Sequence, residues 1–252
     1  MKNEKIENYS EVHLNLSKLV PSLKRNNWKE LGVNIGGDAP KNFLAVYEYK
    51  KGSTVRKSNV DSWPKYIAKV GHKWYPIESI NEYMFNQIGE KLGLNMAFSK
   101  LAMINGQLRF MSRYFLNHQR ESLIHGAEIF AGYVEDLNLL EQIEKEGLAR
   151  KFFTFQFAEK AIRNVFPHDS KQILESLVKM LVFDAITGNN DRHFYNWGVV
   201  KDIKRRNCPK FAPIYDSARG LFWNESESKI ELWYKDAKQI DTRIQKYSEG
   251  SK

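Results

Sequence analysis

In the first half of the chain, hydrophobic and β-branched residues come in short runs separated by glycine and polar residues, a pattern typical of strands. Asn105-Gly106, the strongest short signal for a β-hairpin in the sequence, separates two of these runs. The strands predicted from the pattern are residues 43–49, 65–70, 99–104 and 107–115. We therefore expect a strand-rich first half that ends near residue 116.

Helical patterns dominate the rest. Apolar residues recur every four positions from Ile80 to Leu92, and Gly93 is placed to end that helix. After residue 116 the chain reads as helical to about Thr187. Asp169-Ser-Lys-Gln172 is typical of a capping box, and the helix that follows, residues 173–186, is apolar nearly all round, so we expect it to be buried.

Two short β-like runs, residues 197–201 and 211–215, come last and are joined by a polar loop. Strands are thus segregated from helices along the chain, which favours an α+β protein with two lobes. We place the lobes at residues 1–116 and 117–252. Clefts between lobes are where ligands usually bind.

Composition and charge limit the class of protein. The chain has 252 residues, 42% of them hydrophobic, so intrinsic disorder is excluded for most of its length. The formal net charge of +9 favours polyanionic partners such as nucleotides, nucleic acids or acidic surfaces. The single cysteine, Cys208, can form no intrachain disulfide. The sequence shows neither the pattern of a signal peptide nor an apolar run of about 20 residues. We therefore expect a cytoplasmic protein with no membrane partner.

The segment GNNDRHFYN, residues 188–196, follows the apolar helix where the chain must emerge into a loop. Asp191 and Asn196 are five residues apart, the spacing that protein kinases use for their catalytic base and a magnesium ligand. The same residue types also form turns, so a plain polar loop is the alternative. A transition-metal site on Asp191 and His193 is less favoured, because no other histidine lies at ligand spacing.

Asp216 stands at the end of the second late β-like run. Because a hairpin folds back on itself, we expect it to return Asp216 to the neighbourhood of Asn196. One carboxylate and one amide oxygen make a hard-oxygen site that suits Mg²⁺ together with nucleotide phosphates.

Phosphoryl transfer also needs a cation on the phosphates, and Lys69 lies in the run YIAKV, similar to the V-A-I-K strand of kinases. An ordinary edge-strand lysine is the alternative. An acidic residue of the next helix should pair with Lys69. Glu82 is our choice, with Glu78 and Glu90 as rivals that helical phase does not separate.

A glycine turn precedes these elements. Gly36 and Gly37 are followed by a basic residue, Lys41, and such a turn can present backbone amides to phosphate. Most Gly-Gly pairs are plain turns, so the pair is a weak signal when it is taken alone.

Together these segments resemble a known family, the HipA-like serine/threonine kinases. GNNDRHFYNWGVV and FAPIYDSARG are similar to its catalytic and metal-binding segments, and they are the specific matches. GGDAPK resembles its phosphate loop, YIAKV its ATP-lysine strand, and NEYMFNQIGEKLGL the start of its helix. The matches occur in the expected order from Gly36 to Gly220, over most of the chain.

The resemblance implies a protein-kinase-like fold with a β-rich N-lobe and a mainly helical C-lobe that carries a catalytic β-hairpin. It implies an ATP- and Mg²⁺-dependent serine/threonine protein kinase, a toxin or effector with a protein substrate, for example an aminoacyl-tRNA synthetase, and an antitoxin or other regulatory partner. The implied roles are Asp191 as catalytic base, Asn196 and Asp216 as Mg²⁺ ligands, Lys69 on the ATP phosphates with Glu82 as its partner, Gly36, Gly37 and Lys41 beside the phosphates, and backbone groups near Arg113 and Tyr114 facing the adenine.

Three features depart from the family. Asn34 stands about where the family has its inhibitory autophosphorylation serine, so that control is missing or moved. The N-terminal subdomain of the full-length toxins has no room here. Few residues follow Asp216, whereas relatives carry more helices there, so we expect either a minimal C-lobe or a truncated chain.

Other functions stay open. A small-molecule or lipid kinase would use the same ATP machinery. A basic nucleic-acid-binding protein without catalysis is suggested by the net charge and by the loop 201–210. That loop can equally be a solvated hairpin, and the aromatic residues fall in apolar runs rather than on exposed stacking platforms. An inactive relative that only binds nucleotide ranks last, because every polar group that the chemistry needs is present. We therefore expect that nucleic acid is not required.

Overall fold

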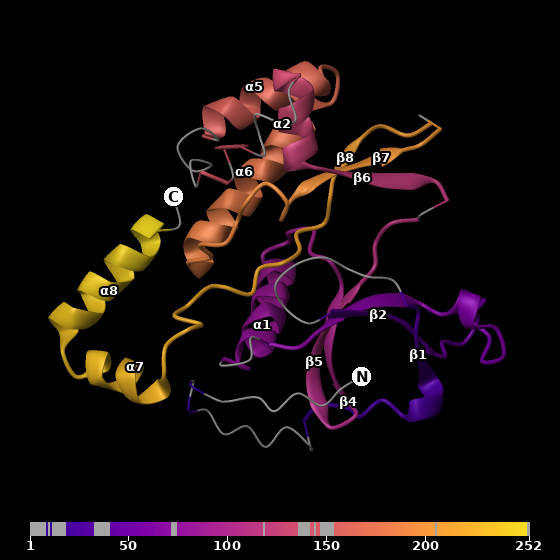
Figure 1. The fold of residues 1–252 in the computed structure, drawn as a ribbon, viewed down its shortest axis with the longest axis horizontal. Coiled ribbons are helices and arrows are strands. Elements are labelled where there is room, and N and C mark those ends of the chain that lie inside the picture. Colours follow the sequence, from indigo (N-terminus) through magenta and orange to yellow (C-terminus); the bar gives the residue numbers. More distant parts are fainter. Residues whose placement is uncertain are drawn as a thin grey trace. The chain divides into compact units, whose positions relative to one another are not determined.

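A computed structural model describes most of the chain, namely residues 9, 11, 19–32, 41–71, 75–117, 119–135, 142, 143, 145, 146, 154–204 and 206–250. The chain groups into two compact units, and most of their helices and strands are labelled in Figure 1. Unit 1 comprises Met1–Tyr114, Ala185–Asn190 and Asp216–Lys252, and unit 2 comprises Phe115–Asp184 and Asp191–Tyr215. The lobe boundary at residue 116 stays a prediction.

The described part of unit 1 is built on a five-stranded antiparallel sheet with the strand order β1-β2-β3-β5-β4. Its strands are β1 (Trp28–Glu30), β2 (Lys41–Val46), β3 (Lys65–Lys69), β4 (Ser99–Ile104) and β5 (Gln107–Arg113). Strands β4 and β5 form the hairpin predicted around Asn105-Gly106. Both turn residues have positive φ, 51° and 77°, as a type I′ turn requires.

The two faces of this sheet carry different side chains, because successive residues of a strand point to opposite faces. One face packs into a buried apolar cluster made of Trp28, Leu44, Val46, Tyr66, Ala68, Ala102, Ile104 and Met111. Lys69 and Phe110 are partners in the β3–β5 register and lie on the other face. The alternation in β3 thus buries Tyr66 and Ala68 on one side and directs Lys69 to the other.

Helix α1 (Glu78–Lys91) contacts β4 and β5 and is followed by Gly93, whose φ of +75° suits a glycine at a helix C-terminus. The helix was predicted from an apolar stripe, but that stripe does not face the sheet. Met84, Ile88 and Leu92 are exposed. The buried residues of the helix are Glu78, Ser79, Glu82, Phe85, Asn86 and Gly89. The helix therefore presents a partly polar face to the sheet, and the contacts of Glu82 and Asn86 explain why.

Unit 2 contains a three-stranded antiparallel sheet in its described part, with the order β6-β7-β8. Its strands are β6 (Glu121–His125), β7 (Gly198–Asp202) and β8 (Lys210–Phe211). The hairpin of β7 and β8 confirms the late pair of strands, although β8 is shorter than expected. The expectation of helix directly after residue 116 was wrong at β6. That strand is stabilised by pairing with β7, far away in sequence, which a five-residue local pattern does not reveal.

The described helices of unit 2 include α2 (Gly126–Val134) and α5 (Phe155–Val165), which contact each other. Helix α6 (Ser170–Thr187) runs from unit 2 into the first residues of the segment 185–190. It begins directly after Asp169, whose carboxylate accepts a hydrogen bond from the Gln172 side chain. The expectation that this helix is buried on all sides was wrong. One face is buried, and the apolar residues Val178, Leu181, Val182 and Ile186 are exposed.

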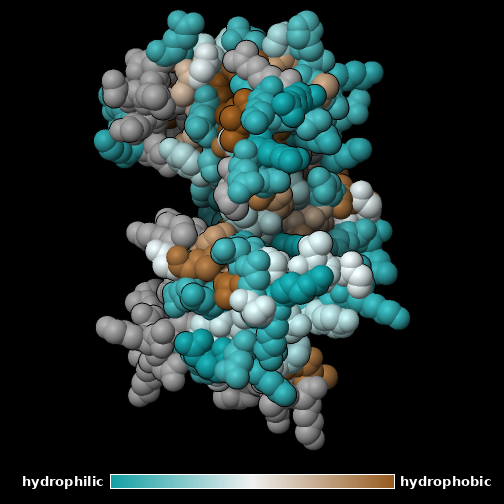
Figure 2. All heavy atoms as spheres, turned by 90° about the vertical axis from the view of Figure 1, so that its right-hand side faces the viewer, coloured by the Kyte–Doolittle hydropathy of each residue, from teal (hydrophilic) through white to brown (hydrophobic). Residues whose placement is uncertain are grey.

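The C-terminal helices α7 (Glu227–Tyr234) and α8 (Ala237–Gly250) of unit 1 contact each other, and short 3-10 helices lie at Arg25–Asn27 and Val60–Ser62. Within the described ranges, no helix has both the length and the apolar character needed to cross a bilayer. Figure 2 shows one face of the molecule, on which hydrophilic side chains predominate and hydrophobic ones form separate small patches.

Candidate active site

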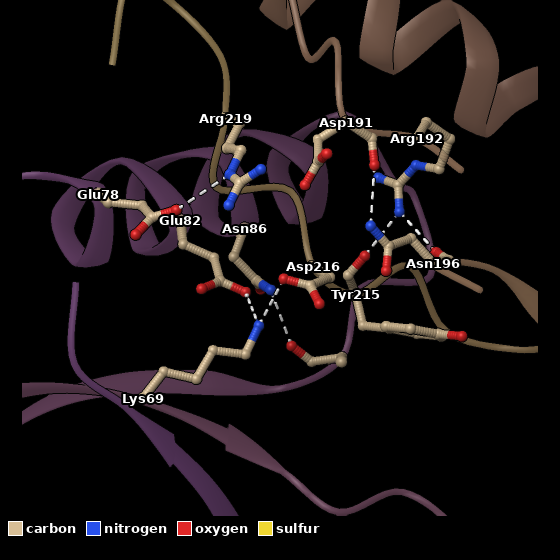
Figure 3. A network of polar contacts seen from close by, with 11 residues as sticks. Lys69, Glu78, Glu82, Asn86, Asp191, Arg192, Asn196, Tyr215, Asp216 and Arg219 are labelled. Carbon is tan, nitrogen blue, oxygen red and sulfur yellow. Dashed lines mark hydrogen bonds and ion pairs between the residues drawn. The ribbon is translucent and has the colours of Figure 1, made fainter. Parts of the chain in front are cut away.

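Lys69, at the end of β3, is the cation at the centre of a polar cluster in unit 1. Its Nζ donates to Glu82 Oε1 at 2.8 Å and to Asp216 Oδ1 at 2.7 Å (Figure 3). The structure thus pairs Lys69 with Glu82 rather than with the rivals Glu78 and Glu90. Glu78 instead lies 3.5 Å from Arg219 Nε.

Burial controls the electrostatics of this cluster. The side chains of Lys69 and Glu82 are 12% and 6% exposed. Burial alone would lower the pKa of Lys69, but Asp216 and Glu82 outweigh it and raise that pKa above its usual range. Burial raises the pKa of Glu82 to about 7; the charge of Lys69 opposes this, while Asp216 adds to it. Two carboxylates therefore share the buried ammonium group of Lys69.

Asp216 adopts a left-handed backbone conformation, with a φ of 56°. Such conformations are costly for residues other than glycine and are concentrated at functional sites. The residues after Asp216 are held firmly within unit 1. The backbone N–H of Asn190 donates to Arg219 O, and a Cβ atom on Gly220 would lie 2.4 Å from Thr187 O. The backbone that directly follows Asp216 is therefore held in place within unit 1.

Lys41, the first residue of β2, is the register partner of Lys69. Register partners in an antiparallel pair lie on the same face of the sheet, so a second cation stands beside Lys69. No ion pair of Lys41 occurs among the described residues. Two adjacent lysines repel each other unless anions compensate them, and an anionic ligand would do so. Gly36 and Gly37 lie outside the described residues, so the phosphate-loop prediction for them stays untested.

Arg113 and Tyr114 lie at the end of β5, where the sequence predicted an adenine-facing segment. The backbone N–H of Arg113 donates to Phe98 O, and that of Tyr114 donates to Lys65 O. Both N–H groups are therefore committed to the sheet of unit 1. A contact of these two residues with adenine, which stays a prediction, would have to use their carbonyl oxygens. The ring of Tyr114 packs edge-on against Phe43, with centroids 5.2 Å apart.

Asp191 and Asn196 lie in unit 2, on the loop between α6 and β7. The loop closes on itself, because the Asn196 backbone N–H donates to His193 O at 2.9 Å and its Nδ2 donates to Asp191 O at 2.8 Å. The second bond fixes the orientation of the amide, since only the nitrogen can donate. The Oδ1 atom of Asn196 is thereby left as the acceptor end of the side chain.

Arg192, between these two residues, is a functional candidate that the sequence analysis missed. It forms a buried two-pronged ion pair with Asp184. Its Nη1 donates to the carbonyl oxygens of Asn196 and Tyr215, at 2.6 and 2.7 Å (Figure 3). One nitrogen atom therefore holds Asn196 next to Tyr215, the residue that precedes Asp216 in the chain. An arginine in a charged loop gives no sequence signal for such a role.

The described residues contain no group of three or more His, Cys, Asp or Glu side chains arranged to hold a metal ion. Of the two predicted Mg²⁺ ligands, Asp216 in unit 1 offers a carboxylate and Asn196 in unit 2 offers an amide oxygen. Both are hard oxygen donors, the kind that Mg²⁺ prefers, and Mg²⁺ commonly takes few protein ligands together with phosphates. Each residue by itself therefore has the chemistry of a Mg²⁺ ligand.

The fold and these residues define a kinase-like protein. The solved structure of the proinflammatory kinase CtkA of Helicobacter pylori matches 89% of this chain and 69% of its own, with a TM-score of 0.69 and 19% sequence identity. At that identity the likeness establishes the fold, and it confirms the predicted kinase-like class.

The chain belongs to the HipA-like C-terminal domain family, whose model matches residues 33–249. The predicted family is thereby confirmed. A weaker structural match, with a TM-score of 0.43 and 15% identity, is to a chain of the toxin–antitoxin complex of HipA, HipB and operator DNA from Shewanella oneidensis MR-1. It covers 74% of this chain and 43% of that one. No curated protein sequence matches this chain.

Proposed function

We propose that this protein is an ATP- and Mg²⁺-dependent kinase that phosphorylates serine or threonine residues of a protein. The observation that carries the proposal is the buried Lys69, which bonds to both Glu82 and Asp216. Protein kinases hold ATP phosphates with a lysine that pairs with a helix glutamate, next to a metal-binding aspartate. Membership of the HipA-like family supports the same reaction class.

In this proposal each residue has a defined task. Lys69 and Lys41 contact the phosphates of ATP, and Asn196 and Asp216 hold Mg²⁺, which supplies positive charge to the phosphate oxygens. The hydroxyl oxygen of the substrate forms a bond to the γ-phosphorus while the bond from that phosphorus to the β–γ bridging oxygen breaks, and ADP leaves. Asp191 accepts the proton of the hydroxyl group.

Charge supports these assignments. Lys69 bonds to Glu82 as well as to Asp216, so a divalent cation that binds Asp216 would leave Lys69 paired with Glu82. Lys41 adds a cation on the same face of the sheet. Bound phosphates would compensate both lysines in a partly dry environment, where charge interactions are stronger than in water.

The direct test is to incubate the purified protein with γ-labelled ATP and Mg²⁺, alone and with a cell lysate. We expect label in protein, recovered after acid hydrolysis as phosphoserine or phosphothreonine, and dependence on Mg²⁺. Label that appears only in small molecules or lipids would assign the same site to the alternative kinase classes. Absence of both label transfer and ADP formation, in protein whose melting temperature shows that it is folded, would contradict the proposal.

We further propose, from membership of the family, that a regulatory protein of the antitoxin kind binds this kinase and that its substrate is a protein. Phosphorylated bands in the lysate experiment would identify the substrate by mass spectrometry. In the same assay, a regulatory partner would be detected as a protein that inhibits the labelling reaction.

A further inference from the structure

Arg192 and Asp184 form an ion pair that is almost completely removed from water. Arg192 Nε and Nη2 donate to the two carboxylate oxygens of Asp184, at 2.7 and 2.9 Å. The side chains are 5% and 3% exposed. Asp184 lies on α6, so the helix carries the anion that fixes the position of the guanidinium group.

The remaining side of the guanidinium group faces two backbone carbonyls. Nη1 donates to Asn196 O at 2.6 Å and to Tyr215 O at 2.7 Å. These carbonyls belong to the proposed catalytic loop and to the end of the chain that leaves β8. Arg192 therefore joins three parts of unit 2: helix α6, the proposed catalytic loop and the segment that follows β8.

The planar shape of the group makes this connection strict. An arginine presents donors in a fixed fork, so an acid gripped on one edge determines where acceptors on the other edge must lie. A lysine has a single flexible ammonium group and cannot reproduce that fork. Burial adds to the constraint, because a buried charge that loses its partners is strongly unfavourable.

We infer that Arg192 is a positioning residue, which with Asp184 holds Asn196 and the residue before Asp216 at a fixed separation. The proposed Mg²⁺ ligand Asn196 is thereby held in place before the cation arrives. This inference rests on the proposed function of the site. Residues that orient metal ligands without touching the metal typically contribute about 10- to 100-fold to metal affinity.

A role confined to stability would have a different signature. Weakening a buried ion pair lowers the melting temperature whether or not the pair positions a ligand. If the pair positions a ligand, weakening it also raises the Mg²⁺ concentration that is needed to form the nucleotide complex. The two roles are therefore separated by a metal titration of folded protein.

The experiment compares wild type with Arg192→Lys and Asp184→Asn. Each protein is titrated with Mg²⁺ at a fixed concentration of a non-hydrolysable ATP analogue, and the rise in melting temperature is followed. We expect the half-saturating Mg²⁺ concentration to increase about tenfold or more in both variants, while the shift caused by the analogue without Mg²⁺ stays unchanged. The matched controls are Arg163→Lys and Glu159→Gln, which weaken an exposed arginine–glutamate pair on α5 and should leave the titration unchanged.

The outcomes separate the inference from the function on which it rests. No effect of Mg²⁺ on nucleotide binding by wild type would overturn the proposed function. A normal Mg²⁺ dependence in wild type and in a folded Arg192→Lys protein would overturn the inference alone. If neither variant folds, hydrogen exchange of wild type decides. We expect exchange at residues 192–196 to be slow already in the free protein, and fast exchange there without Mg²⁺ and the analogue would contradict the positioning role.

Discussion

The polar cluster around Lys69 in unit 1 and the contacts of Arg192 in unit 2 are both built on buried cations, but the partners of the two cations differ. Lys69 bonds to two carboxylates, Glu82 and Asp216. Arg192 bonds to the carboxylate of Asp184 and to the backbone carbonyl oxygens of Asn196 and Tyr215. The first cation is thus shared by two ionisable side chains, whereas the second also binds to the main chain.

The difference shows how burial can serve two purposes. Two carboxylates that share one ammonium group can take up a further cation, so this arrangement suits the binding of Mg²⁺ and a change of protonation. A guanidinium group that binds a carboxylate on one edge and backbone carbonyls on the other fixes geometry instead. We therefore assign binding to the Lys69 cluster and positioning to Arg192, and the following changes test that division.

Asp191→Asn should have the largest effect on rate. The variant removes the proton acceptor of the proposed reaction, and general-base contributions are about 10²- to 10⁴-fold. We expect phosphotransfer to fall within that range, while the thermal shift given by the nucleotide is kept. The measurement is single-turnover label transfer. Asp241→Asn, an exposed change on α8, is the control, and label transfer at the wild-type rate by Asp191→Asn would remove this loop from the mechanism.

Lys69→Met should reduce activity by about 10²-fold, the effect typical of losing one preorganised charge interaction. It also leaves Glu82 buried without its cation, so the melting temperature should fall. Lys69→Met combined with Glu82→Gln should recover stability but not activity. Lys100→Met is the matched control, because Lys100 lies on β4 of the same sheet and pairs with a carboxylate, that of Glu48. Full activity of Lys69→Met would show that Lys69 is a structural lysine.

Asp216→Ala should weaken the binding of Mg²⁺ and not affect the removal of the proton from the substrate hydroxyl group. Without this carboxylate the proposed Mg²⁺ site loses its only charged protein ligand. We expect the thermal shift produced by Mg²⁺ with ATP to shrink to that of ATP alone. A shift as large as in wild type would mean that Asp216 serves the backbone turn only, and Asp236→Ala, between the C-terminal helices, serves as the control.

The pH dependence should reveal the raised pKa of Glu82 in the Lys69 cluster. The pKa of Glu82 is raised from 4.5 to about 7, chiefly by burial. Ionising Glu82 therefore costs stability as the pH rises from about 4.5 to about 7, but it supplies the anion that holds Lys69. We expect nucleotide affinity to fall as the pH is lowered through about 7. In Glu82→Gln this step should be absent, and persistence of the step would assign it to another group.

The smallest effect is expected for the hairpin of β7 and β8. Lys204→Ala combined with Arg206→Ala removes two charges outside both clusters, so kinase activity should change by less than about twofold. A nucleic-acid-binding protein would behave differently: its affinity would weaken, and the slope of its salt dependence would flatten by about one unit for each phosphate that is no longer neutralised. Such behaviour, with no ATP turnover in wild type, would contradict the kinase proposal.

Local patterns in the sequence were sufficient for several elements. Asn105-Gly106 predicted a hairpin because few residues tolerate the positive φ that its turn needs. Gly93 marked the end of α1 for a similar reason. The strand pattern of residues 65–70 predicted β3 and placed Lys69 on it. The five-residue spacing of Asp191 and Asn196 indicated the proposed catalytic loop.

Periodicity, however, gives the repeat of a helix and not the face that it buries. The apolar stripe of α1 is exposed, because the inner face is used by Glu82 and Asn86, which bond to Lys69 and to Ala97 O. The sequence could not choose among Glu78, Glu82 and Glu90 for the same reason. That choice depends on where α1 lies against the sheet.

The sequence by itself determined the family, the type of each well-marked element and the residues able to carry the chemistry, since these depend on short-range pattern and residue type. Only the tertiary structure decided which of them meet. Lys69 and Asp216 are 147 residues apart, and Arg192 reaches Tyr215 across 23 residues. Contacts over such separations are set by the packing of whole elements, which no local run of residues encodes.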